Sequence, residues 1–272
     1  MPRDTITTSM IASPGFEYKK RVMMLGVASL CLTLSIAFYG SIAAVTSNEI
    51  LAVAQLRVID PVKKTANDGS ATFISPDGYL LTNFHVIQPA LEEEKSVPLL
   101  CLTLDARKPP QCIPTVLDIA AYDEDRDLAL LKIKQVIVKG EQGWTDFDQF
   151  IKNRGFTVNH VRFDRTAEEE NIGLGEQVQI LGYPLAGGRS ITYTLGVVSG
   201  FEREETSEDF LPWLIKTDAK LNPGSSGGAA FNMANEYIGV PTLVRGGVGN
   251  IGYIISLPIV NDFLDGTGIT IN

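Results

Sequence analysis

The sequence predicts an all-β fold, an antiparallel sandwich or barrel, for most of the chain. Beyond residue 46, short apolar runs alternate with turn-forming residues, which is the pattern of short antiparallel strands. Few of the intervening stretches space their apolar residues as a helix would. Strands this short, with so little helix between them, are typical of sandwiches and barrels.

Each expected strand is a short apolar run bounded by turn residues. The second and third of them flank Ser75-Pro76-Asp77-Gly78, whose proline and glycine positions predict a type I turn that closes a hairpin. The expected strands are 55–59, 71–74, 79–82, 99–104, 113–119, 128–133, 178–181, 191–198, 214–217, 237–242 and 251–255. No internal repeat of fixed period is visible in the sequence.

The clearest helical pattern of this part of the chain is at 144–152. It lies in a polar region at 137–172, which we interpret as an inserted surface loop. Cys101 and Cys112 flank an expected hairpin whose pairing would place them opposite each other. A disulfide outside the cytoplasm and a pair of free buried thiols both fit this placement.

Residues 22–45 form an uncharged apolar run that is long enough to cross a bilayer core of about 30 Å. Basic residues precede it at 19–21 and polar ones follow at 46–49, which places the N-terminus in the cytoplasm and the rest outside. We favour an uncleaved signal anchor, because the run exceeds the usual apolar core of a signal peptide. The alternative is a secreted protein, cleaved after a small-residue site such as 41–43.

These boundaries divide the 272 residues into a cytoplasmic segment at 1–21, a transmembrane helix at 22–45 and a folded domain at 46–272. The composition, 44% hydrophobic and 20% charged, is that of a globular protein. A net charge of −9 argues against a nucleic-acid partner. Three cysteines cannot supply a disulfide framework, and two histidines make an all-histidine metal cage unexpected. No cofactor or metal is expected.

Three segments contain residues with catalytic chemistry. His85 follows the expected strand 79–82, Asp127 stands between an acidic run and the strand 128–133, and Ser226 lies in the glycine-rich stretch 217–228. Alone, each has an ordinary explanation as a structural histidine, a turn carboxylate or a flexible loop. Together they provide the nucleophile, the base and the orienting acid of one mechanism.

These segments resemble the trypsin-like serine peptidases of the chymotrypsin fold, in particular the bacterial HtrA/Do-like branch. The matching stretches are GSATFISPDGYLLTNFHVI (69–87), DRDLALLKI (125–133), LGYPLAGGRSITYTLGVVSG (181–200) and IKTDAKLNPGSSGGAAFN (215–232). The resemblance covers roughly 55–260. It implies two six-stranded antiparallel β-barrels and a serine endopeptidase that cleaves polypeptides through an acyl-enzyme.

The resemblance also implies a role for each residue. The Ser226 hydroxyl would attack the substrate carbonyl, and His85 would take its proton, since His160 has no supporting motif. Asp127 would orient the imidazole, and we choose it over Asp125 because it adjoins the apolar strand. The backbone amides of Gly224 and Ser226 would form the oxyanion hole.

Substrate specificity is harder to predict. The resemblance places Lys220 near the floor of the primary pocket, with Thr242 and Leu243 in its wall beside Pro241, and the following strand near Gly252. Lys220 would either favour acidic side chains of the substrate or point into solvent.

The chain also departs from the HtrA pattern. It ends at Asn272, soon after the last expected strand, so the PDZ domains that usually follow the peptidase are not expected. The insertion at 137–172 would either cover the active site or only decorate the surface. The alternative function is a catalytically silent, peptidase-like binding module. The sequence does not indicate the oligomeric state.

Overall fold

The computed structural model divides the chain into two units, Met1–Ile42 and Ala43–Asn272. It describes residues 45–93, 96–113, 115–137, 143–155, 157–162, 172–187, 190–202, 214–242 and 251–271. The predicted cytoplasmic segment at 1–21 and all but the last residue of the predicted membrane helix at 22–45 lie outside these ranges. Among the helices of the described ranges, none is long and apolar enough to cross a membrane.

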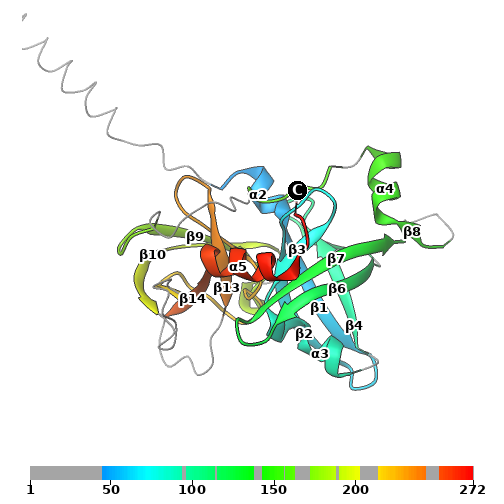
Figure 1. Cartoon of the computed structure of the whole chain (residues 1–272), viewed down its shortest axis with the longest axis horizontal. Coiled ribbons are helices and arrows are strands. Elements are labelled where there is room, and N and C mark those ends of the chain that lie inside the picture. Colours follow the sequence, from blue (N-terminus) through cyan, green and yellow to red (C-terminus); the bar gives the residue numbers. More distant parts are fainter. Residues whose placement is uncertain are drawn as a thin grey trace, which may run out of the picture. The chain divides into compact units, whose positions relative to one another are not determined.

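The first eight strands form one antiparallel sheet (Figure 1). They are β1 (Val53–Asp60), β2 (Thr65–Phe73), β3 (Tyr79–Thr82), β4 (Val97–Leu102), β5 (Gln111–Ile113), β6 (Thr115–Asp123), β7 (Leu128–Val136) and β8 (Thr145–Asp146). Their order in the sheet is β5-β4-β1-β2-β3-β7-β6, with β8 paired to β7. The predicted hairpin is confirmed, because Thr72 of β2 pairs with Leu81 of β3 across the turn.

The remaining six strands close into a barrel in the order β10-β11-β14-β13-β12-β9. They are β9 (Gln177–Gly182), β10 (Thr192–Glu202), β11 (Leu214–Thr217), β12 (Ala229–Phe231), β13 (Tyr237–Thr242) and β14 (Gly252–Ser256). The expectation of two closed barrels therefore holds for the second sheet only. Within the described ranges the first sheet stays open between β5 and β6, because the short β5 pairs with β4 alone.

Cys101 of β4 and Cys112 of β5 are directly opposite each other and form a disulfide with an S–S distance of 2.04 Å. Of the two alternatives for these cysteines, the structure therefore contains the disulfide. Its position matters for the sheet, because it joins the short edge strand β5 covalently to its only strand partner among the described residues.

The described residues contain four helices. They are α2 (Ser47–Ala52), α3 (Phe84–Glu92), α4 (Phe147–Arg154) and α5 (Leu257–Thr267). The predicted helix at 144–152 corresponds to α4, which starts later because Asp146 caps it by accepting from the amide of Gln149 at 3.1 Å. The other three were not predicted. A short 3₁₀ turn, η2 (Leu185–Gly187), follows β9.

One apolar core is shared by the two sheets. The first sheet contributes Leu81 and Leu128, and the barrel contributes Leu181 and Phe231. Helix α5 adds Val260, Phe263 and Leu264 to the same core and runs across the region between the sheets in Figure 1. Each sheet also has a separate core of its own, so the shared core is what holds them together.

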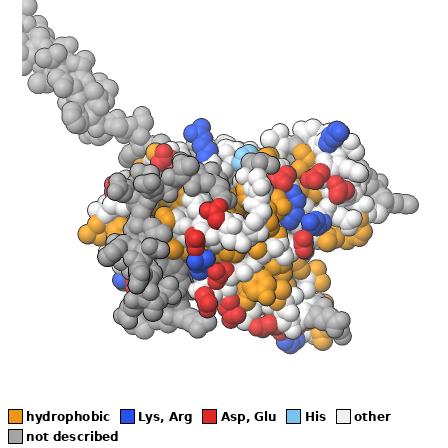
Figure 2. Space-filling view, viewed as in Figure 1, with side chains coloured by type: hydrophobic (Ala, Val, Ile, Leu, Met, Phe, Trp, Pro, Cys, Tyr) orange, Lys and Arg blue, Asp and Glu red, His pale blue; other side chains and the backbone are white. Residues whose placement is uncertain are grey.

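The face that carries α5 has mixed charge. Figure 2 shows acidic side chains spread over this face with a few basic ones beside them. Arg126, before β7, contacts the carboxylates of Asp123 and of Asp262 on α5, and so ties the helix to the first sheet. Such partly exposed pairs add little stability each.

Candidate active site

His85 follows β3, as expected, and is the second residue of α3, a helix that the sequence did not predict. Strand β3 stops at Thr82, and Asn83 is the N-cap of the helix. The Asn83 side chain makes no capping hydrogen bond to the helix, and its amide nitrogen donates to the backbone oxygen of Asp127 at 2.9 Å. The start of α3 is thereby attached to the segment that carries the acid.

Asp127 stands directly before β7 with a left-handed backbone, φ 54°. This conformation is uncommon for residues other than glycine, but aspartate tolerates it better than most. The carboxylate accepts from the backbone amide of His85 at 3.0 Å. It also lies 2.9 Å from His85 Nδ1 through each of its two oxygens. The predicted base and acid are therefore in direct contact.

Thr242 at the end of β13 completes the surroundings of the carboxylate. Its hydroxyl donates to Asp127 Oδ2 at 2.9 Å. The threonine is 3% exposed, whereas the side chain of Asp127 is partly exposed. Asp127 is thus held by groups from α3 and from the closed barrel, which fixes the carboxylate relative to the imidazole.

Ser226 lies in the turn between β11 and β12, and it is 3% exposed. Two glycines of this turn have left-handed backbones, Gly224 with φ 98° and Gly227 with φ 82°. A Cβ on Gly224 would stand 2.4 Å from the Tyr183 oxygen, and one on Gly227 would stand 2.1 Å from the Ser70 oxygen. Only glycine fits at either position, because both the φ angle and the space require it.

The serine turn packs beside the His85–Asp127 pair. The Gly227 amide donates to the Pro241 oxygen at 3.0 Å, one residue before Thr242. A Cβ on Gly227 would also lie 2.3 Å from Thr82 Oγ1, at the end of the strand that leads to His85. The structure therefore brings the three predicted segments together where the two sheets meet.

Two features of the serine turn concern its chemistry. Neither the Gly224 amide nor the Ser226 amide donates a hydrogen bond to any residue that the structure describes. The sequence predicts these two amides as oxyanion donors, a role that needs N–H groups with no partner within the protein. Within the same ranges, no hydrogen bond joins the Ser226 hydroxyl to the His85 ring. Such bonds are often long without substrate and tighten when it binds.

The predicted substrate-binding residues lie near this site to different degrees. Thr242 contacts Asp127, as described, whereas Lys220 is exposed in the segment after β11. Leu243 lies outside the described residues. Gly252 faces Leu221, because a Cβ on the glycine would stand 2.7 Å from that side chain. The ring of His160, the second histidine, contacts the Val158 oxygen at 3.1 Å.

Sequence reasoning missed Ser70, on β2, and the hydrogen bond from Thr242 to Asp127. Ser70 is completely buried and contacts the serine turn through both its side chain and its backbone. Ser70 stands among other polar residues of β2, so the sequence contains no signal that distinguishes it from them. Near this residue, burial raises the pKa of Tyr183. Its hydroxyl shares a hydrogen bond with Thr103 Oγ1 at 2.5 Å.

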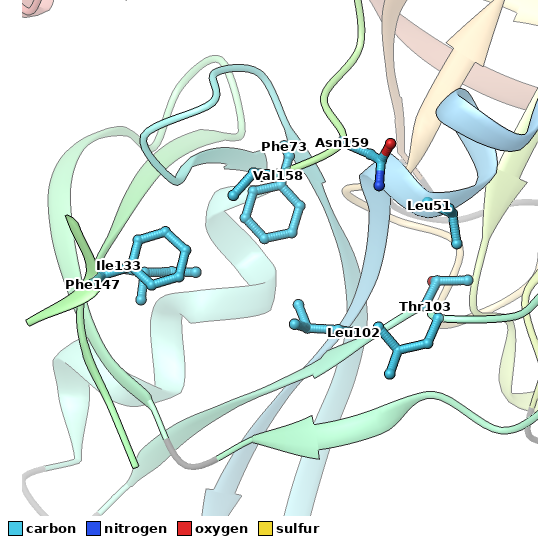
Figure 3. Close-up of a pocket in the computed structure, with 9 residues that line it drawn as sticks. Leu51, Phe73, Leu102, Thr103, Ile133, Phe147, Val158 and Asn159 are labelled. Carbon is cyan, nitrogen blue, oxygen red and sulfur yellow. The ribbon is translucent and has the colours of Figure 1, made fainter. Parts of the chain in front are cut away.

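A separate pocket lies on the first sheet and is almost entirely apolar (Figure 3). Its volume is about 220 Å³, and it is lined by Leu51, Phe73, Leu102, Thr103, Leu104, Ile133, Phe147, Val158 and Asn159. None of these side chains titrates, so the pocket supplies no acid or base. In the described part of the chain, no group of three or more His, Cys, Asp or Glu side chains could hold a metal ion.

Comparison with protein families finds one match. Residues 69–240 match the family model described as "Trypsin-like peptidase domain". The matched range includes His85, Asp127 and Ser226.

Curated relatives agree with this match. One, named "Probable periplasmic serine endoprotease DegP-like", from Hahella chejuensis, is 27% identical over 206 residues, which are 75% of this chain and 36% of the relative. Another of the same name, from Chlamydia pneumoniae, is 29% identical over 213 residues, 75% of this chain and 35% of the relative. The chain thus spans about one third of the length of these relatives.

Solved structures share the architecture. One titled "HtrA-type protease AlgW with tripeptide" superposes with a TM-score of 0.57 at 25% identity, over 83% of this chain and 63% of that one. The structure of Deg5 superposes with a TM-score of 0.57 at 24% identity, over 78% of this chain and 87% of that one. The second likeness concerns the fold alone.

Proposed function

The chain belongs to the trypsin-like peptidase family, and from this premise we propose that it is a serine endopeptidase with Ser226, His85 and Asp127 as its catalytic triad. The observation that carries the proposal is the His85–Asp127 contact, in which Nδ1 lies 2.9 Å from both carboxylate oxygens. A carboxylate on Nδ1 fixes the imidazole tautomer that leaves Nε2 free to accept a proton.

The proposed reaction breaks one peptide bond in two steps. Ser226 Oγ bonds to the substrate carbonyl carbon while His85 Nε2 takes the hydroxyl proton, and the amides of Gly224 and Ser226 hold the oxyanion. His85 then gives the proton to the leaving nitrogen as the carbon–nitrogen bond breaks, which leaves an acyl-enzyme. Water, deprotonated by His85, releases the carboxylic acid and restores the serine. Asp127 stabilises the imidazolium in both steps.

The proposed substrates are polypeptides, reached outside the cytoplasm. The disulfide of β4 and β5 supports this location, because such bonds persist mainly in oxidising compartments. The name "periplasmic" of the relatives supports it too. Anchoring by residues 22–45, with the N-terminus in the cytoplasm, is part of the same proposal. The acidic-substrate preference rests on Lys220 alone, whose exposed side chain is also free to point into solvent.

A second candidate is a silent, peptidase-like binding module. In the described part of the chain no hydrogen bond joins Ser226 to His85. This alternative requires that the bond does not form with substrate either, because an unactivated serine hydroxyl is a weak nucleophile. The two candidates differ in one chemical property, the reactivity of Ser226 toward an electrophile that mimics an acyl group.

A fluorophosphonate probe separates the two candidates. We expect covalent labelling of the wild-type chain and none of Ser226→Ala, as read by mass spectrometry of the modified peptide. Ser225→Ala is the matched control and should still react, because its hydroxyl only accepts a long 3.4 Å hydrogen bond from the Asn222 amide. Folded wild-type protein that resists the probe would favour the binding module.

A further inference from the structure

Ser70 lies where the two sheets meet and is completely buried. It belongs to β2 of the first sheet, whereas both partners of its hydroxyl, Gly224 and Tyr183, belong to the second half of the chain. A polar side chain in such a place is stable only when its hydrogen bonds are satisfied. Those bonds therefore indicate what the residue does.

Every polar group of Ser70 has a partner. Its amide donates to the Ser226 oxygen at 2.8 Å, and its hydroxyl donates to the Gly224 oxygen at 2.8 Å. The hydroxyl accepts from the Tyr183 amide at 2.9 Å, and the Ser70 oxygen accepts from Thr82 Oγ1 at 2.7 Å. A serine hydroxyl has one proton to donate, and here that proton is used on Gly224.

Ser70 holds the backbone carbonyl of each proposed oxyanion donor, Gly224 and Ser226. The oxygen of Pro223 accepts from the Leu185 amide at 2.8 Å. Because a trans peptide is planar, the Gly224 N–H must then point away from Leu185. The next carbonyl, of Gly224 itself, is held by Ser70. Glycine rotates more freely than any other residue, so Gly224 needs both restraints to keep its amide in one direction.

We propose that Ser70 is a positioning residue of the oxyanion hole. Its hydroxyl, oriented by the Tyr183 amide, holds the Gly224 carbonyl, and its amide holds the Ser226 carbonyl. The unpaired Gly224 and Ser226 amides then converge on one point before substrate binds. A residue of the first sheet thereby sets the direction of two backbone amides that belong to the second half of the chain. This inference rests on the proposed peptidase function, because an oxyanion hole has meaning only for acyl transfer.

The test measures how fast the full chain reacts with a fluorophosphonate, since the phosphonyl oxygen occupies the oxyanion hole in the transition state. Saturation kinetics separate the maximal rate of phosphonylation from the affinity for the probe, and the labelling endpoint gives the folded fraction. We expect Ser70→Ala to lower the maximal rate on the order of 10- to 100-fold, below the 10²–10³ of losing a donor outright. Affinity and endpoint should stay close to wild type.

Thr72→Val is the matched control. Thr72 is a buried hydroxyl on the same strand, and it donates to the Gly227 oxygen over a longer 3.4 Å contact that flanks neither donor amide. Its loss should lower the thermal midpoint without slowing phosphonylation. A merely structural role of Ser70 would lower the endpoint and leave the rate of the folded fraction unchanged.

Several outcomes overturn the inference. A Ser70→Ala variant that is phosphonylated at the wild-type rate would overturn it. A Thr72→Val variant that is phosphonylated as slowly as Ser70→Ala would also overturn it. If Ser70→Ala does not fold, Ser70→Cys decides by the same criterion, because a thiol fills the space but donates weakly. Wild-type protein that never reacts overturns the proposed function itself, which is a different result from any of these.

Discussion

At the scale of single residues, the carboxylate of Asp127 organises the site. It accepts from the backbone and the ring of His85 and from Thr242, and so joins α3 to β13. Its left-handed backbone, φ 54°, turns the chain so that the side chain points at the imidazole while β7 begins at the next residue. Asp127 thus both forms the turn before β7 and orients the imidazole for the proposed chemistry.

Asp127→Asn is a clean test of this arrangement. Asparagine tolerates the left-handed backbone as well as aspartate does, so we expect a folded protein with an unchanged thermal midpoint. An amide facing Nδ1 favours the wrong imidazole tautomer, and phosphonylation of Ser226 should slow on the order of 10⁴-fold. Asp125→Asn, at an exposed position two residues earlier, should react as wild type does. Equal rates for the two variants would remove Asp127 from the triad.

The three proposed triad residues were predictable because each lies in a local motif that the sequence displays. Thr242 was expected in the substrate pocket, but its hydrogen bond to Asp127 was not foreseen. Ser70 was missed altogether. Both bonds join residues more than a hundred positions apart, and their geometry exists only once the two sheets have packed. The local sequence around each residue therefore does not predict which distant residue it will bond to.

At the scale of elements, the turn between β2 and β3 is held by the ammonium group of Lys132, whose side chain is mostly buried. The Lys132 ammonium, on β7, donates to the Asp77 oxygen at 2.6 Å and to its carboxylate at 2.7 Å. It also lies 4.3 Å above the ring of Tyr79. Burial raises the pKa of Asp77, but hydrogen bonds from Lys132 and Ser75 and the lysine charge outweigh it, so the pKa is lowered overall.

This shift predicts a pH-dependent contribution to stability. A lowered pKa stabilises the folded state above the unfolded value of about 3.9, and the contribution is lost as the pH falls through the folded value. Near neutral pH, Asp77→Asn should lower the free energy of unfolding by about 0.5 to 1 kcal/mol, a small value because the side chain is 47% exposed. Urea titrations at a series of pH values would measure the difference, which should shrink below about pH 4.

Asp118→Asn is the control for this prediction. Its pair with Lys134, at 3.3 Å, is about half exposed on both sides, so its loss should change stability less. A difference between Asp77→Asn and wild type that persists unchanged into acid would show that the carboxylate charge is not its source.

The sequence predicted strands better than helices. The expected strands 79–82, 214–217 and 237–242 match β3, β11 and β13. A single strand was expected at 113–119, because apolar residues lie on both sides of the break. In the structure, β5 ends at Ile113 and β6 begins at Thr115. Helix α3 was missed because its first residues, Phe84 to Ile87, also read as the continuation of a strand. Short apolar runs do not distinguish the two.

At the scale of the whole molecule, the proposed active site depends on both sheets. His85 and Asp127 belong to the half with the open sheet, whereas Ser226 and Thr242 belong to the closed barrel. The shared core fixes the two halves against each other. Sequence patterns predict each sheet separately, but they do not predict whether strand pairing closes it, since closure depends on the lengths and register of its edge strands.

The last prediction concerns residues 22–45, which lie almost entirely outside the described residues. If this run is an uncleaved anchor, the full chain should stay with membranes through alkaline carbonate extraction. Its intact mass should include the N-terminus, and a membrane-impermeant fluorophosphonate should label Ser226 from outside the cytoplasm. Leu34→Lys would place a charge near the middle of the run, at a cost of about 3 kcal/mol to insertion.

Leu34→Ile is the control, because it keeps the run apolar and should leave the protein in the membrane fraction. Wild-type protein found in the extracytoplasmic soluble fraction, with a new N-terminus just after residues 41–43, would mean that the run is a cleaved signal peptide. Labelling of that released form would still place the peptidase outside the cytoplasm, since both alternatives translocate the chain beyond residue 46. The location of the active site and the fate of its anchor are therefore separate questions, and the two measurements answer them independently.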